Sequence, residues 1–154
     1  MPRPIAAALV MVMLAAGSTG TSTAQTGPGQ AAAARQRILV HVTHGPEQPT
    51  RAALAFLVAR TAADEGHAVT LFLAGDAVQL LRDAVLDSLT GLGTGKLREH
   101  YDAIVKAGGR FYLSGMSGNA RGVAAADLQG KPAEFAQPTV LVRLALEHDR
   151  MFTY

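Results

Sequence analysis

Residues Ala68 to Leu73, with the sequence AVTLFL, are apolar at nearly every position. A strand with one solvated face alternates apolar and polar residues, whereas a strand that is covered on both faces is apolar almost throughout. This segment therefore predicts a strand of a parallel sheet with helices packed on both of its faces.

Further apolar segments alternate with segments of helical spacing along the rest of the chain. Strands are expected at residues 38–42, 68–73, 110–113, 133–135 and 151–154. Helices are expected at residues 50–65, 76–85, 97–107 and 138–148, with a short helical turn after residue 122. Alternating strands and helices predict an α/β fold, a three-layer α/β/α sandwich around a mostly parallel sheet of about five strands.

The first of these helices has an apolar side and a charged side. Its expected buried stripe consists of residues at helical spacing, namely Leu54, Leu57, Val58 and Thr61. Arg60 and Asp64 form an i,i+4 pair on the other side, and Gly66 is placed to end the helix.

The first 36 residues differ in composition from the rest. Arg3 precedes an unbroken apolar run from Ile5 to Ala16, and small residues follow up to Ala24. This pattern predicts a signal peptide at 1–24 and a flexible leader at 25–36, so the folded domain spans 37–154. The run is too short to cross a bilayer, because a span needs about 20 helical residues. We expect export to the periplasm or beyond without stable membrane insertion, the alternative being an uncleaved anchor.

Composition excludes several classes of function. The chain has 14 Lys and Arg against 12 Asp and Glu, a formal charge of +2, and its basic residues form no cluster. Nucleic-acid binding is therefore not expected. The chain has no cysteine, which excludes disulfides, thiolate metal sites and thiol chemistry. We predict no metal and no cofactor.

The segment from Gly91 to Leu97, GLGTGKL, superficially resembles a phosphate-binding loop. The phosphate loop requires a glycine five residues before the Gly-Lys pair and a hydroxyl after the lysine, but this chain has Thr90 and Leu97 there. The segment also lies between two predicted helices. We therefore interpret it as a flexible linker.

His41 and His44 lie three residues apart, a spacing that could suggest a metal site. Side chains three apart on a strand point to opposite faces, so His41 is expected to face a covering helix while only His44, already in a turn, faces the ligand crevice. We interpret the pair as one packed and one turn histidine.

Ligands of parallel sheets bind in the crevice at the carboxyl ends of the strands. Three loops leave those ends, at residues 43–50, 74–76 and 114–122. The third, SGMSGNARG, offers two hydroxyls, three glycines that free backbone N–H groups, and Arg121 at the expected start of a short helix. These features are typical of an anion cradle. The alternatives are a plain structural turn, and a serine nucleophile with a base from the first loop.

The candidate ligand-binding residues all belong to these three loops. They are His44, Glu47, Asp76, Ser114, Ser117, Gly118, Asn119 and Arg121.

Several segments together carry a family resemblance. They are THGPE at 43–47, RA at 51–52, EGHAVTLFL at 65–73, GDAV at 75–78, FYL at 111–113 and Ala120-Arg121-Gly122. In this order they resemble the DsrE/DsrF-like family, with the YchN-type fold, over nearly all of residues 37–154. Each segment alone has little specificity, whereas their succession is fairly specific.

The resemblance implies a parallel α/β domain that forms homo-oligomers, commonly trimers or hexamers. It also implies sulfur transfer, because the best-understood members pass sulfur as a cysteine persulfide in cytoplasmic relay complexes. The family's cysteine positions match Ser114 and Ser117 here. A serine hydroxyl cannot hold a persulfide, so the resemblance supports the fold and not the chemistry.

The sequence thus predicts a divergent exported member that lacks the family cysteines. Its expected function is that of a non-catalytic oligomeric binding module for a small anionic ligand or a protein partner. The alternative is a hydrolase- or transferase-type enzyme that uses Ser114 or Ser117 with His44 as base. A third alternative is a structural oligomer whose crevice is filled by a neighbouring chain.

The position of the mature amino terminus is a first testable prediction. Ser22 and Ala24 place small side chains where a signal peptidase binds them, so the exported protein should begin near Gln25. Amino-terminal sequencing of the envelope fraction measures this directly. Recovery of a membrane-bound chain that retains Met1 would contradict it.

Overall fold

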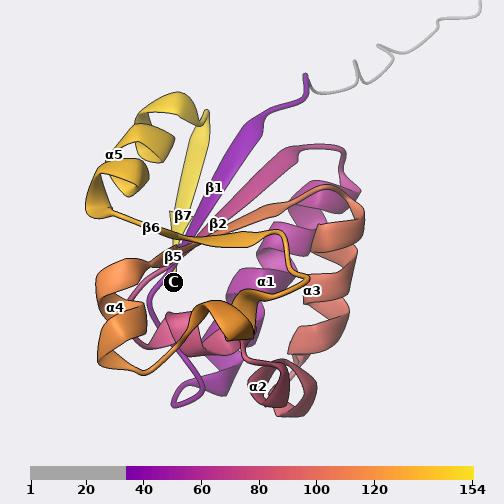
Figure 1. Ribbon diagram of the computed structural model, residues 1–154. Helices are drawn as coiled ribbons and strands as arrows, with labels where there is room; N and C mark the ends of the chain where they lie inside the picture. Colours follow the sequence, from indigo (N-terminus) through magenta and orange to yellow (C-terminus); the bar gives the residue numbers. More distant parts are fainter. Residues whose placement is uncertain (1–33) are drawn as a thin grey trace, which may run out of the picture. The chain divides into compact units, whose positions relative to one another are not determined.

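The structure, a computed structural model, describes residues 34–154 of the chain (Figure 1). The predicted signal peptide at 1–24 and most of the predicted leader at 25–36 lie outside the described residues. The elements, in chain order, are β1 (Arg37–Val42), α1 (Pro49–Asp64), β2 (Ala68–Leu73), the 3-10 helix η1 (Gly75–Leu81), α2 (Asp83–Ser88), β3 (Thr90–Gly91), β4 (Gly95–Lys96), α3 (Leu97–Lys106), β5 (Arg110–Ser114), α4 (Gly115–Ala120), the 3-10 helix η2 (Ala125–Leu128), β6 (Ala133–Ala136), α5 (Pro138–Glu147) and β7 (Arg150–Thr153).

Five strands form one sheet in the order β6-β5-β2-β1-β7. All four pairings are parallel, which confirms the α/β prediction and sharpens "mostly parallel" to fully parallel within this sheet. In the central register, Leu71 of β2 lies between Val40 of β1 and Phe111 of β5. Because every strand runs in the same direction, all five carboxyl ends lie along one edge of the sheet.

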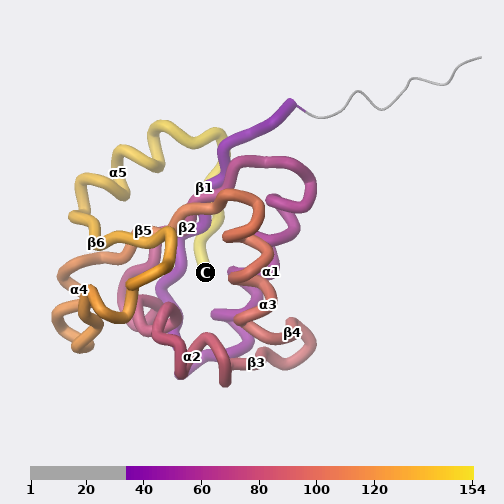
Figure 2. The backbone as a smooth tube through the Cα atoms, turned by 45° about the vertical axis from the view of Figure 1, so that its right-hand side comes forward, coloured from indigo at the N-terminus to yellow at the C-terminus, as the bar shows by residue number. Residues whose placement is uncertain are grey.

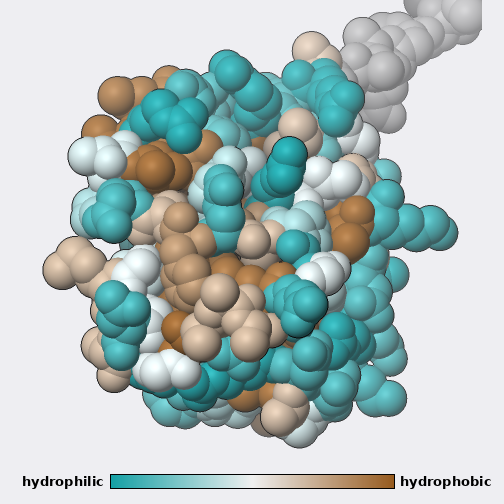
Figure 3. Space-filling view, viewed as in Figure 1, coloured by the Kyte–Doolittle hydropathy of each residue, from teal (hydrophilic) through white to brown (hydrophobic). Residues whose placement is uncertain are grey.

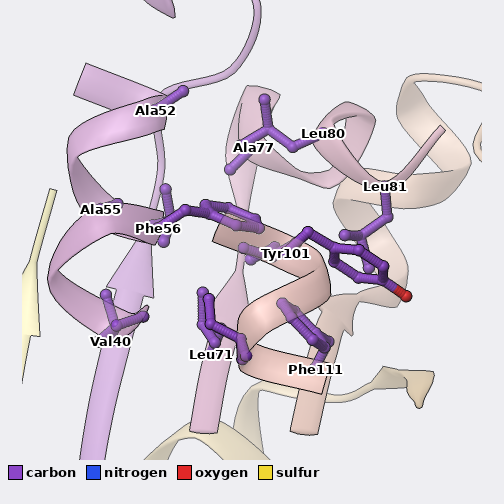
Figure 4. Close-up of a cluster of buried hydrophobic side chains, with 14 of the residues drawn as sticks. Val40, Ala52, Ala55, Phe56, Leu71, Ala77, Leu80, Leu81, Tyr101 and Phe111 are labelled. Carbon is purple, nitrogen blue, oxygen red and sulfur yellow. The ribbon is translucent and has the colours of Figure 1, made fainter. Parts of the chain in front are cut away.

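One face of the sheet carries the main hydrophobic core. Helices α1 and α3 pack over it, and η1 and α2 close the end near the carboxyl edge (Figures 1 and 2). Phe111 contacts two aromatic rings, with centroids 6.0 Å from Phe56 and 5.1 Å from Tyr101 (Figure 4). Aromatic pairs at these spacings add to the burial energy, so the cluster fixes α1 and α3 on β5.

The buried face of α1 differs from the predicted stripe. It consists of small residues and one large one, namely Ala52, Ala53, Ala55, Phe56, Ala59 and Ala62. Leu54, Leu57 and Val58 are only partly buried, and Thr61 is exposed. The prediction was wrong because it followed side-chain size. Helix α1 packs against both the sheet and α3, and alanines on the shared face let the backbones approach closely.

The opposite face of the sheet is covered more thinly. Among residues 34–154, its buried cluster contains only Leu39, Phe72, Ala136 and Leu144, with partly buried neighbours that include Tyr112, Val140 and Leu141. Helix α5, which connects β6 at one edge of the sheet to β7 at the other, packs on this face through Leu144. At the end of α5, His148 Nε2 lies 3.0 Å from Thr70 Oγ1 of β2.

The segment predicted as a flexible linker is instead a small hairpin. Strands β3 and β4 pair antiparallel between α2 and α3, and Leu92 N–H donates to Thr50 Oγ1 of α1 at 3.1 Å. A Cβ at Gly91 would overlap Thr94 and Ala53. The glycines therefore allow the hairpin to pack tightly on α1, a contact that local sequence does not reveal.

The predicted helix at 76–85 is divided into η1 and α2, with a break at Arg82. The predicted helices and strands after residue 97 occur within about two residues of their expected bounds. Within residues 34–154, no helix is long and apolar enough to cross a membrane.

His41 generates a prediction about stability and pH. Its side chain lies on the thinly covered face beside Phe72, with ring centroids 6.1 Å apart, and its buried Nε2 has no hydrogen-bond partner within the described chain. Burial lowers the pKa of His41 below its ordinary value of about 6.5. Below that pH the unfolded chain binds a proton that the folded chain does not, so acidification reduces the free energy of unfolding.

Replacing His41 with leucine should remove this acid sensitivity. We expect His41→Leu to lose less stability than the wild type when the pH falls from 7.5 to 5.5, as measured by urea denaturation at both values. Equal losses for the two proteins would show that His41 does not contribute to the pH dependence.

Candidate functional site

The loops at the carboxyl edge of the sheet are held together by direct contacts. The Gly75 N–H, after β2, donates to Ser117 Oγ in α4 at 3.0 Å. Gly45, after β1, packs so closely on the Asp76 carbonyl that a Cβ there would overlap it. The three loops predicted to form the crevice are therefore in contact, although they are far apart in the sequence.

Ser114 and Ser117 both use their hydroxyls as structural acceptors. The segment predicted as a loop is largely helix α4, and Ser114 is its N-cap, with Ser117 N–H donating to Ser114 Oγ at 3.3 Å. Ser117 Oγ in turn accepts the Gly75 N–H. The backbone N–H of Ser117, a candidate ligand-binding residue, is thus engaged by the cap.

Arg121 was expected at the start of a short helix, but it lies at the end of helix α4. The helix begins at Gly115 and ends at Ala120, so Arg121 is its C-cap, and the expected helix start at Arg121 was wrong. Arg121 Nε donates to Asp76 Oδ1 at 2.6 Å, and the side chains are 28% and 48% exposed. This ion pair joins the loop after β5 to the loop after β2.

Gly118 and Asn119 have different surroundings. Gly118 is buried, and a Cβ there would lie 2.7 Å from Phe135 Cε1, so glycine at this position permits close packing of α4 on β6. We expected Gly118 to leave its backbone accessible to a ligand. Its packing against Phe135 is an alternative reason for a glycine at this position. Asn119 is exposed, and its side chain makes no hydrogen bond to the described residues.

His44 and Glu47 lie in the loop between β1 and α1. His44 Nε2 is 3.2 Å from Arg51 NH1, and Nδ1 is 3.5 Å from Thr43 Oγ1. Because arginine is always a donor, Nε2 accepts this bond and the proton of the neutral ring is on Nδ1. Both carboxylate oxygens of Glu47 accept the Gly45 N–H, at 2.8 and 3.1 Å.

No hydrogen bond among residues 34–154 joins His44 to Ser114 or Ser117. A serine nucleophile requires a base within hydrogen-bonding reach, and the two hydroxyls contact backbone N–H groups instead. Within residues 34–154, neither hydroxyl therefore has the contact with His44 that the alternative enzyme mechanism needs.

Sequence reasoning did not select two arginines at the carboxyl edge as site residues. Arg51, in the first turn of α1, contacts His44, and Arg82 NH2 donates to the carbonyls of Arg121 and Gly122 at 2.9 and 2.6 Å. His44 and Arg51 are seven residues apart in the sequence, with a turn between them. Because they do not belong to one regular element, their separation does not predict a contact. Arg82 is 39 residues from Arg121, so only the folded chain brings them together.

Comparison with known proteins identifies the family. The profile of the DsrE/DsrF-like family matches residues 36–154. The chain belongs to the DsrE/DsrF-like family. No curated protein sequence matches it significantly.

Solved structures show the same fold as this DsrE/DsrF-like chain. The YchN protein from E. coli is similar with a TM-score of 0.63 and 16% sequence identity, covering 77% of this chain and 99% of that one. A conserved protein of unknown function from Bacteroides thetaiotaomicron has a TM-score of 0.58 and 10% identity, covering 77% of this chain and 95% of its own. At these identities the likeness concerns the fold alone. It confirms the predicted YchN-type fold.

The hydroxyl of Ser117 generates a stability prediction for this DsrE/DsrF-like domain. Ser117→Ala leaves the Gly75 N–H without its acceptor, so we expect a loss of about 1 kcal/mol in the free energy of unfolding. The matched control is Ser88→Ala, since the exposed Ser88 hydroxyl only bonds the Ala84 carbonyl in its own helix, and its loss should be within about 0.5 kcal/mol. Equal effects in urea denaturation would contradict a role for Ser117 in joining the loops.

Proposed function

We propose that this chain is an exported DsrE-like domain that acts as an oligomeric binding module for a small anionic ligand, and that it does not transfer sulfur through a persulfide. The observation that carries the proposal is the state of the two serine hydroxyls at the carboxyl edge. Both stand where the family resemblance places cysteines, and both are acceptors for backbone N–H groups.

The chemistry of serine supports the second half of the proposal, the absence of sulfur transfer. A persulfide requires a thiol, and the chain has none. A serine nucleophile would need a base, while His44 Nε2 is engaged by Arg51. The carboxyl edge therefore has no thiol and no contact between a serine hydroxyl and His44, and non-covalent binding is the function that its residues support best.

Cationic groups at the carboxyl edge support an anionic ligand. Arg121 contacts Asp76 through Nε only, and its two terminal nitrogens make no hydrogen bond to the described residues. Arg51 forms no ion pair within residues 34–154, and it lies beside His44. Guanidinium groups with unused donors bind carboxylate, sulfate or phosphate oxygens strongly because such hydrogen bonds are charge-assisted.

The two nearby carboxylates differ in their partners. Asp76 accepts from Arg121, so its charge is paired. Glu47 is exposed and accepts only the Gly45 N–H, so it keeps its negative charge. The unused donors of Arg121 and Arg51, and not an absence of negative charge, favour an anion here.

Calorimetric titration with sulfate, thiosulfate and phosphate tests the anion site. Arg121→Ala should weaken binding by about 1.5–3 kcal/mol, because it removes a charge-assisted contact, whereas Ser114→Ala should cost about 1 kcal/mol or less. A melting curve of each variant serves as the control for folding. Unchanged affinity together with a lowered melting temperature would mean that Arg121 only joins the loops through Asp76.

A further inference from the structure

A cavity of about 250 Å³ lies toward the amino edge of the sheet, where the strands begin. One of its lining residues, His67, directly precedes β2, and another, Glu65, is the C-cap of α1. The apolar part of its wall comes from α1, β1 and β7, through Val58, Ala62, Ile38 and Phe152. The cavity is therefore separate from the carboxyl-edge loops, and it joins an apolar wall to polar side chains.

The size and the wall of this cavity suit one small aromatic ring. In another protein an apolar cavity of about 150 Å³ binds benzene, so 250 Å³ is enough for a ring with a small substituent. Phe152 lines the cavity and is 43% exposed, so its ring can form an edge-to-face or offset-stacked pair with a ligand ring. Contact with Ile38 and Val58 removes further apolar surface of such a ligand from water.

Two polar side chains of the cavity have unused hydrogen-bonding capacity. The Gln36 N–H donates to His67 Nδ1 at 3.3 Å, so the ring proton of His67 is on Nε2. His67 Nε2 lies 3.8 Å from Glu65 Oε2, which is beyond hydrogen-bonding distance, and neither group makes a hydrogen bond within residues 34–154. The third polar residue, Thr61, already donates to the Leu57 carbonyl. The cavity thus offers one N–H donor beside one carboxylate acceptor.

We propose that this cavity binds a small uncharged phenol, with the ring against the apolar wall and the hydroxyl between His67 and Glu65. A hydroxyl is both a donor and an acceptor, so one oxygen can accept from His67 Nε2 and donate to the Glu65 carboxylate. The bond to the carboxylate is charge-assisted and therefore stronger than one between neutral groups. The His67 side chain is only 14% exposed, so the ligand pairs a donor that has limited access to water.

Other polar groups match this pair less well. A carboxylate or phosphate can accept from His67, but its charge is repelled by that of Glu65. An ammonium group can donate to Glu65, but it has no lone pair for the His67 N–H. An aliphatic alcohol satisfies both groups but lacks a ring to pair with Phe152. The combination of donor, acceptor and aromatic wall therefore selects a phenol.

A nuclear magnetic resonance titration of the isotope-labelled full chain with phenol tests the site. We expect saturable changes in the backbone amide shifts of the residues around the cavity. Two related probes keep the ring and change the polar group. Anisole can accept but cannot donate, and benzoate carries a negative charge. Each should bind about tenfold or more weakly than phenol, because each loses the charge-assisted bond to Glu65.

Two variants with matched controls locate the binding. Val58→Trp should fill the cavity and abolish phenol binding. Its control is Val142→Trp, which adds the same side chain at a 60% exposed position of α5, on the other face of the sheet. Hydrophobic atoms gather over this helix at the upper left of Figure 3. Glu65→Ala should weaken phenol binding about tenfold, whereas Asp64→Ala removes a neighbouring carboxylate that does not line the cavity and should have no effect.

The outcomes separate this inference from the proposed anion site. Phenol binding that is lost in Val58→Trp, weakened in Glu65→Ala and retained in both controls supports the proposal. Absence of saturable shifts, or binding that neither variant changes, would overturn it. Equal affinity for phenol, anisole and benzoate would overturn the role of His67 and Glu65. Failure of phosphate or sulfate to bind would count against the proposed anion site alone. Circular dichroism melting of every variant confirms that it folds.

Discussion

Strand β2 lies at the centre of the sheet with a parallel partner on each side, β1 and β5, and this position constrains the rest of the domain. A parallel pair cannot be joined by a tight turn, so each connection needs a crossover segment, which here contains a helix. Val69, Leu71 and Leu73 face the α1 and α3 side, while Phe72 faces α5. The strand is therefore stable only when both faces of the sheet are covered.

The two faces satisfy this requirement unequally. On one face α1 and α3 pack closely over an aromatic cluster around Phe111, and the alanines of α1 permit the close contact. On the other face a single crossover helix, α5, packs through Leu144 and leaves apolar residues facing outward. The same shortage of cover leaves His41 only half-buried beside Phe72.

The carboxyl edge follows from the same parallel arrangement, since all five strands end there. The contacts at this edge mainly join the loops: Ser117 to Gly75, Arg121 to Asp76, and Arg82 to the chain after α4. Serine hydroxyls meet these structural needs as neutral acceptors. They do not supply the nucleophilicity or the reversible sulfur bonding of a thiol.

The sequence alone determined the parallel α/β class, most element positions, the family and the loops at the carboxyl edge. These features depend on local hydrophobic periodicity, on the placement of glycine and proline and on short motifs. Each of these signals lies within a single segment of the chain. Only the tertiary structure decided that alanines form most of the buried face of α1, that residues 90–96 pack as a hairpin, and that Arg121 follows α4 and contacts Asp76. Each of these depends on residues distant in sequence, such as Asp76 and Arg121, 45 positions apart. The pattern within a segment shows which side chains are apolar or charged. Which residues those side chains contact depends on how the whole chain packs.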